Sequence, residues 1–209
     1  MKCLPTIFLL LPTAVVLTSC KINSLESSSK TSCCSQAQAE SPGTFTDKSI
    51  YQVQTTWTTD RGNQIKLDQL KGRPQVVAMF FANCQFACPI IVNDMKRIES
   101  SLPPESRSRV GFTLVSFDSE RDTPAVLAKY RKTRALPAER WTLLRGSPDD
   151  VLELSALLGV KFKADANGQF AHSNVITILN AQGEIVYQQA GLNQDIQKAR
   201  QTLRQLVGK

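Results

Sequence analysis

Two cysteines at the end of an apolar run are the residues of this chain best suited to chemistry. Cys84 and Cys88 lie in the stretch Phe-Phe-Ala-Asn-Cys-Gln-Phe-Ala-Cys-Pro, with three residues between them. At that spacing the two sulfurs can form a disulfide or bind one metal ion. Redox sites of the Cys-x-x-Cys type have two intervening residues, so the third residue favours metal binding.

The residues around the pair predict a buried strand followed by a helix. Residues 75–81 read Gln-Val-Val-Ala-Met-Phe-Phe, as expected for a strand covered on both faces. Pro89 suits the first turn of a helix, and apolar residues then recur at helical spacing, at Ile91, Met95, Ile98 and Leu102. Cys88 is therefore expected at a helix N-terminus, where unpaired N–H groups and the helix dipole would lower its pKa.

His172 is the only histidine of the chain and the third candidate for chemistry. It follows residues 161–170, which are polar, contain glycine and lack periodicity, and which we expect to form a loop. In a thioredoxin-like fold that loop would face the cysteine helix. Two thiolates and one imidazole would then form a three-coordinate site suited to copper, since thiolates select Cu(I) and imidazole also accepts Cu(II). The alternative to a metal-binding role is that His172 is a structural residue, buried in the core with its ring nitrogens hydrogen-bonded.

The remaining pattern predicts one α/β domain in which strands and helices alternate. A turn at residues 60–63 joins the first two strands into a hairpin, and two consecutive prolines predict a loop at 101–106. Further strands are expected at 50–57, 64–67, 110–117, 141–144, 175–179 and 185–187, and helices at 124–134, 148–158 and 196–206. The loops after the strands share one sheet edge, where α/β folds place their sites. Asp118 at that edge is expected to be structural, and Phe86 to be an exposed docking residue.

These motifs together resemble the Sco/SenC family of copper chaperones. The resemblance extends from Thr46 to the C-terminus and is based on four motifs: Cys-x-x-x-Cys-Pro, Ser-Phe-Asp-Ser-Glu-Arg-Asp-Thr-Pro at 116–124, residues 141–146, and His172-Ser173. It implies a thioredoxin-like α/β fold, with a central mixed sheet flanked by helices and an N-terminal hairpin. The chain departs from the family pattern at Gln85, where a proline is usual, and at Ala171, where an aspartate is usual.

The resemblance also implies a function. Copper, as Cu(I) or Cu(II), would be held by Cys84, Cys88 and His172, received from a periplasmic donor, and delivered to the binuclear copper site of the copper-bearing subunit of cytochrome c oxidase. The family also contains thiol-disulfide reductases, so the alternative is an extracytoplasmic oxidoreductase. In that case Cys84 and Cys88 would be the catalytic redox pair and no histidine would be needed.

The N-terminus has the pattern of a bacterial lipoprotein. Residues 1–19 carry Lys2 and then an apolar core, as in an export signal, and Leu-Thr-Ser precedes Cys20, the expected lipidation site. The alternatives are an uncleaved membrane anchor or ordinary secretion. Residues 20–43 would be the lipidated N-terminus and a flexible tether, and residues 44–209 the folded domain. This places the protein in the cell envelope, anchored by lipid and facing the extracytoplasmic space.

Two observations remain from the composition. Cys33 and Cys34 are adjacent within the tether, which suggests a copper relay or, as the alternative, a vicinal or interchain disulfide. The formal charge of +7 suits an anionic membrane surface or an acidic partner. A nucleic-acid partner is not expected, because the chain carries no recognition motif or Arg-rich run and has an export signal.

Overall fold

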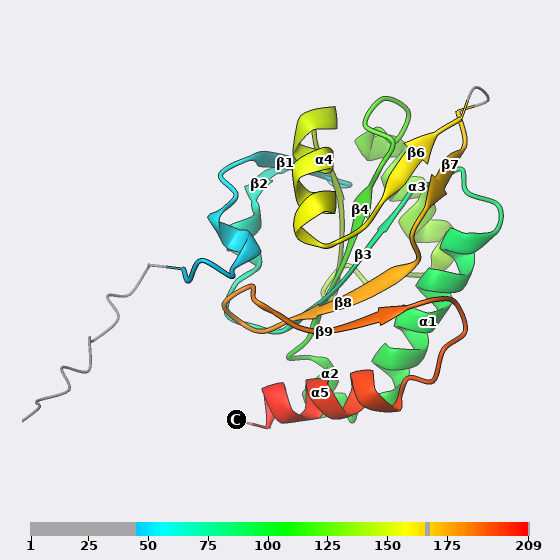
Figure 1. Ribbon diagram of the computed structural model, residues 1–209. Coiled ribbons are helices and arrows are strands. Elements are labelled where there is room, and N and C mark those ends of the chain that lie inside the picture. Colours follow the sequence, from blue (N-terminus) through cyan, green and yellow to red (C-terminus); the bar gives the residue numbers. More distant parts are fainter. Residues whose placement is uncertain (1–44, 166–167, 209) are drawn as a thin grey trace, which may run out of the picture. The chain divides into compact units, whose positions relative to one another are not determined.

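A seven-stranded mixed sheet forms the centre of the computed structural model, which describes residues 45–165 and 168–208 (Figure 1). The strand order is β2-β1-β5-β4-β3-β8-β9; β3 pairs in parallel with β4, and β4 with β5, while the other neighbours are antiparallel. The strands of this sheet are β1 (Thr56–Thr59), β2 (Gln64–Lys66), β3 (Gln75–Phe80), β4 (Gly111–Ser116), β5 (Trp141–Arg145), β8 (Val175–Leu179) and β9 (Ile185–Ala190). The predicted mixed sheet with a leading hairpin is confirmed.

Helices cover both faces of the sheet. Figure 1 shows α1 (Ala87–Ser101) and α3 (Pro124–Arg134) on one side and α4 (Pro148–Leu157) on the other, while α5 (Gln197–Val207) packs against α1 and β9. Because both faces are covered, every residue of β3 and β4 is buried. Removing this apolar surface from water is the main force that stabilises the fold.

Side chains at the helix starts explain why two helices begin where the sequence predicts. The Thr123 side chain accepts a hydrogen bond from the Val126 N–H and precedes Pro124, the first residue of α3. Ser147 and Asp150 form a reciprocal capping box at the start of α4. Both arrangements satisfy N–H groups that a helix end leaves without partners.

Two short elements differ from the prediction. The strand predicted at 50–57 is instead a 3-10 turn, η1 (Ile50–Gln52), followed by the shorter β1, because Ser49 caps the turn by accepting a hydrogen bond from the Tyr51 N–H. The loop predicted at 101–106 contains a one-turn helix, α2 (Pro104–Arg107), since a proline is well placed at the first helical position. A second 3-10 turn, η2 (Leu67–Leu70), leads toward β3.

The prediction of a loop at residues 161–170 is wrong. Residues Phe162–Ala164 (β6) and Phe170–His172 (β7) form a separate antiparallel hairpin, in which Phe162 pairs with His172. The hairpin is held by its aromatic residues: the Phe162 ring lies 4.8 Å from that of Phe117. His172 therefore sits on a paired strand.

The predicted export signal, Cys20 and the Cys33-Cys34 pair lie outside the described residues. Within the described part of the chain, no helix combines the length and the apolar character needed to cross a membrane.

Candidate metal site

The structure brings the three predicted ligands together. Cys84 lies in the loop after β3, Cys88 in the first turn of α1, and His172 at the end of β7. Their sulfur and nitrogen atoms all lie within 4.8 Å of one another, and the Cys88 Sγ is 3.6 Å from the His172 Nε2. In the described part of the chain this is the one such group of three metal-ligating side chains.

The loop between the sulfurs is shaped by backbone hydrogen bonds. The Cys84 N–H donates to the Phe81 carbonyl at 3.2 Å, which turns the chain as it leaves β3. The Cys88 N–H donates to the Cys84 Sγ at 3.3 Å, so the first turn of α1 supplies a donor to the sulfur that precedes it. Both thiols are free; Cys88 is buried and Cys84 is half-buried.

Burial raises the pKa of the Cys88 thiol well above its usual value, contrary to the prediction from its helix position. A hydrogen bond with the Phe81 backbone opposes the shift, whereas Cys84 and the Asp122 carboxylate add to it. The loss of hydration outweighs the helix N-terminus because Cys88 has no exposed surface. In the metal-free protein Cys88 is therefore a protonated thiol, and a metal ion binding there must displace its proton.

The orientation of His172 is set by its neighbours. Its Nδ1–H donates to the Ser173 carbonyl at 3.1 Å, which leaves the lone pair of the neutral ring on Nε2, the atom that faces Cys88. A hydrogen bond from the other ring nitrogen is the usual way in which proteins orient a metal-binding histidine.

Aromatic rings that the sequence analysis did not assign to the site form its wall. The centroid of the Phe117 ring lies 5.1 Å from that of His172, and the Phe81 ring 6.3 Å away and nearly perpendicular. Phe170 packs against Phe81 at 5.1 Å. Alternation along β7 puts Phe170 and His172 on the same face of the strand, a signal that the loop prediction concealed.

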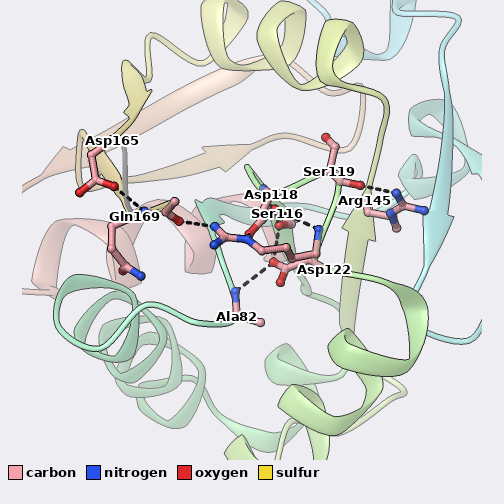
Figure 2. Close-up of polar contacts among 10 residues, drawn as sticks. Ala82, Ser116, Asp118, Ser119, Asp122, Arg145, Asp165 and Gln169 are labelled. Carbon is pink, nitrogen blue, oxygen red and sulfur yellow. Dashed lines mark hydrogen bonds and ion pairs between the residues drawn. The ribbon is translucent and has the colours of Figure 1, made fainter.

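Asp122 is a buried carboxylate that links the cysteine loop to β4 (Figure 2). Its Oδ2 accepts hydrogen bonds from the Ala82 N–H at 2.9 Å and from the Ser116 hydroxyl, and the Ser116 Oγ accepts from the Asp118 N–H. Burial raises the pKa of Asp122, and the hydrogen bonds from Ser116 and Ala82 oppose that shift. In the sequence, Asp122 stands out only as part of the motif at residues 116–124.

Asp118 has the structural role that the sequence predicted. Its carboxylate forms an ion pair with Arg121, whose guanidinium also donates to the Gly168 carbonyl and lies over the Phe170 ring. These contacts join the loop after β4 to the hairpin that carries His172.

Phe86, between the two cysteines, is 83% exposed, more than any other large apolar side chain in the described residues. The predicted exposure of this ring beside the site is confirmed.

The donor set fits a copper ion in type and in spacing. Three donors placed about 2.2 Å from one ion in a plane lie about 3.8 Å apart, given ligand distances of about 2.0–2.3 Å for imidazole and thiolate. The separation of Cys88 and His172 is 3.6 Å, and no pair of donors is more than 4.8 Å apart. A small closure of the loop would bring all three to one ion.

Comparison with known proteins finds a matching family and solved structures of similar fold. The chain matches the SCO1/SenC family over residues 46–208. It is 25% identical over 142 residues to the SCO1 protein homolog of Bacillus subtilis, an alignment that covers 65% of this chain and 72% of that protein. Many solved structures share the fold, and two serve as examples. One is a SCO1/SenC family lipoprotein from Bacillus anthracis (TM-score 0.66, 23% identity, covering 72% of this chain and 91% of that one). The other is Arabidopsis thaliana ScoI with copper bound (TM-score 0.65, 19% identity, covering 74% and 96%).

Proposed function

The chain belongs to the SCO1/SenC family, and we propose that it is a metallochaperone that holds one copper ion with Cys84, Cys88 and His172. The observation that carries the proposal is that these three donors, from three separate elements, lie within 4.8 Å of one another. Two thiolates favour Cu(I), and the imidazole extends the site to Cu(II).

Copper is the cargo of this site, and delivery requires that a partner reach it. Cys88 is buried and His172 is backed by aromatic rings, whereas Cys84 is half-buried and Phe86 projects beside it. A partner thiolate would therefore replace Cys84 first, with Phe86 as a docking contact. We assign delivery to the binuclear copper site of the copper-bearing subunit of cytochrome c oxidase, and loading to a periplasmic copper donor.

The proposed location is the extracytoplasmic side of a bacterial membrane. Residues 1–19 would be removed as an export signal, Cys20 would carry the lipid, and residues 20–43 would tether the domain of residues 44–209. The lipoprotein from Bacillus anthracis that shares the fold supports this arrangement. A tether of this length would allow the domain to reach a membrane-bound partner.

Thiol-disulfide exchange is the second candidate function. The two sulfurs differ in access, with one buried and one half-buried, as expected of a resolving and an attacking cysteine. The two activities are compatible, since a partner's copper site needs reduced cysteines before it takes up metal.

Copper transfer tests the chaperone role. The copper-loaded protein would be mixed with the copper-free soluble domain of the oxidase subunit. The visible absorption of the binuclear copper centre of that subunit would then be recorded. We expect the absorption to appear with wild-type protein, and Cys84→Ser with Cys88→Ser to give none beyond a free-copper control. Equal transfer by both would contradict the proposal.

A further inference from the structure

A cavity of about 450 Å³ opens beside Cys84. One wall is the cysteine loop, including Asn83 and Cys84, and the other is α3, including Lys129, Tyr130 and Arg134. The copper site does not use these α3 residues. The volume of the cavity is in the range of pockets that bind small molecules.

Two positive charges at this cavity, Lys129 and Arg134, lack an ion-pair partner in the described part of the chain, and the one acidic residue of its lining is the buried Asp122. Within the described residues neither Lys129 nor Arg134 forms an ion pair, and the Arg134 guanidinium lies over the Tyr130 ring at 5.4 Å. Arg121 also lines the cavity, but its charge is matched by Asp118. The Asp122 carboxylate is buried and accepts hydrogen bonds from Ser116 and Ala82. The cavity therefore favours an anionic ligand.

The ligand would meet a reactive sulfur. Cys84 is the more accessible cysteine of the pair, and its sulfur accepts a hydrogen bond from the Cys88 N–H. The Tyr130 ring provides an apolar surface beside it, packed at 5.0 Å against Phe80. A small molecule with carboxylates, a sulfur and some apolar surface matches each of these features.

We propose that this cavity binds a low-molecular-weight disulfide bearing carboxylate groups, and that Cys84 reacts with it when the protein is copper-free. The Cys84 thiolate attacks one sulfur of the bound disulfide; a bond forms between the two, the ligand's sulfur–sulfur bond breaks, and one thiolate leaves and takes a proton from solvent. Cys88, after losing its proton, then attacks the Cys84 sulfur and releases the second thiol. The pair loses two electrons and becomes a disulfide, and the ligand gains them as two thiols.

This reaction would couple the copper site to the surrounding thiol pool, because the oxidised pair has no thiolate left to bind copper. It extends the proposed copper function but does not depend on it, since the exchange needs only the two thiols.

The test compares two disulfides on the full chain, with Cys33→Ser, Cys34→Ser and Cys88→Ser so that the mixed disulfide at Cys84 accumulates. One is dithiobis(nitrobenzoate), which carries two carboxylates, and the other is neutral dithiodipyridine. The rate of adduct formation is followed on the Cys84 peptide by mass spectrometry. With the dianionic reagent we expect the rate to saturate with concentration.

Removing the positive charges of Lys129 and Arg134 should slow the reaction of Cys84 with the dianionic reagent only. Lys129→Gln with Arg134→Gln is expected to slow the dianionic reagent about ten-fold or more and to leave the neutral one unchanged. Lys132→Gln is the matched control, because Lys132 is an exposed cation of α3 that does not line the cavity. An unchanged rate with the neutral reagent also shows that the variant is folded around Cys84.

The proposal is overturned if the double variant slows both reagents equally, or if Lys132→Gln slows the dianionic reagent as much, since either result shows that the cavity has no specific role. Copper binding is measured separately on the Lys129→Gln, Arg134→Gln chain with Cys88 restored, and should be unaltered. A wild-type chain that binds no copper would contradict the chaperone proposal alone.

Discussion

His172 and Cys88 are 84 residues apart in the chain, yet the Nε2 of one lies 3.6 Å from the Sγ of the other. The contact depends on the β6–β7 hairpin, which is folded over Phe117 and presents His172 to the first turn of α1. A metal ion bound between these atoms would link the hairpin to the helix.

Replacing the histidine should separate the two candidate functions. In His172→Ala, Cu(II) affinity is expected to fall by about 10- to 100-fold or more, since the only nitrogen donor is lost. Cu(I) can still bind to two thiolates, and disulfide reduction should survive. Parallel Cu(II) titration and a disulfide-reduction assay check this. Unchanged Cu(II) binding together with a loss of reductase activity would show that His172 serves thiol chemistry.

The predictable part of the structure came from long, strongly patterned segments. The apolar runs of β3 and β4 and the caps of α3 and α4 encode those elements locally, because burial and hydrogen bonding act within a few residues. The three ligands were predictable as a set only through the family resemblance and the assumed fold, which place His172 opposite the cysteines.

The errors lie where tertiary contacts override the local pattern. The strands β6 and β7 are three residues each, too short to show a periodic pattern, and they form because Phe162 and Phe170 pack with Phe117. The pKa of the Cys88 thiol is raised by burial, which outweighs the helix dipole. The extent of burial is a property of the folded chain. Asp122 likewise binds Ala82, 40 residues away, a contact with no signal in the sequence.

The tether cysteines should not be needed for copper. Cys84 and Cys88 have a rigid framework, so the double change Cys33→Ser, Cys34→Ser is expected to leave one copper per chain and the same visible spectrum. Metal analysis after gel filtration measures this. Half the copper content in the variant would show that the tether takes part.

Membrane attachment should depend on Cys20. Cys20→Ser removes the proposed lipidation site, and the protein is expected to move from the membrane fraction to the soluble fraction. Fractionation after a salt wash, with Cys33→Ser as the matched control, measures the change. Retention of the variant on washed membranes would contradict the lipoprotein assignment.

Asp122 should influence stability in two ways. Asp122→Ala leaves the Ala82 N–H and the Ser116 hydroxyl without their acceptor, which should lower the free energy of unfolding by about 1–3 kcal/mol. Asp122→Asn keeps one acceptor oxygen and removes the charge. Urea unfolding under reducing conditions measures both.

The pH dependence follows from the raised pKa of Asp122. A carboxyl whose folded pKa lies above its unfolded value binds its proton more tightly when folded, so protonation stabilises the folded state. Wild type should therefore gain stability relative to Asp122→Asn as the pH falls through the folded pKa toward the unfolded value of about 3.9. Glu153→Gln, at an exposed position of α4, is the control. A difference in stability between wild type and Asp122→Asn that is constant with pH, or that changes with pH in the opposite direction, would contradict this account.

X-ray absorption at the copper edge tests the proposed site most directly. The protein loaded with one Cu(I) should show two sulfur neighbours and one nitrogen neighbour, near the distances of about 2.3 Å and about 2.0 Å typical of thiolate and imidazole ligands. In His172→Ala the imidazole signal should disappear, and in Cys84→Ser one sulfur should be lost. A spectrum without sulfur, or one that neither substitution alters, would show that copper binds elsewhere.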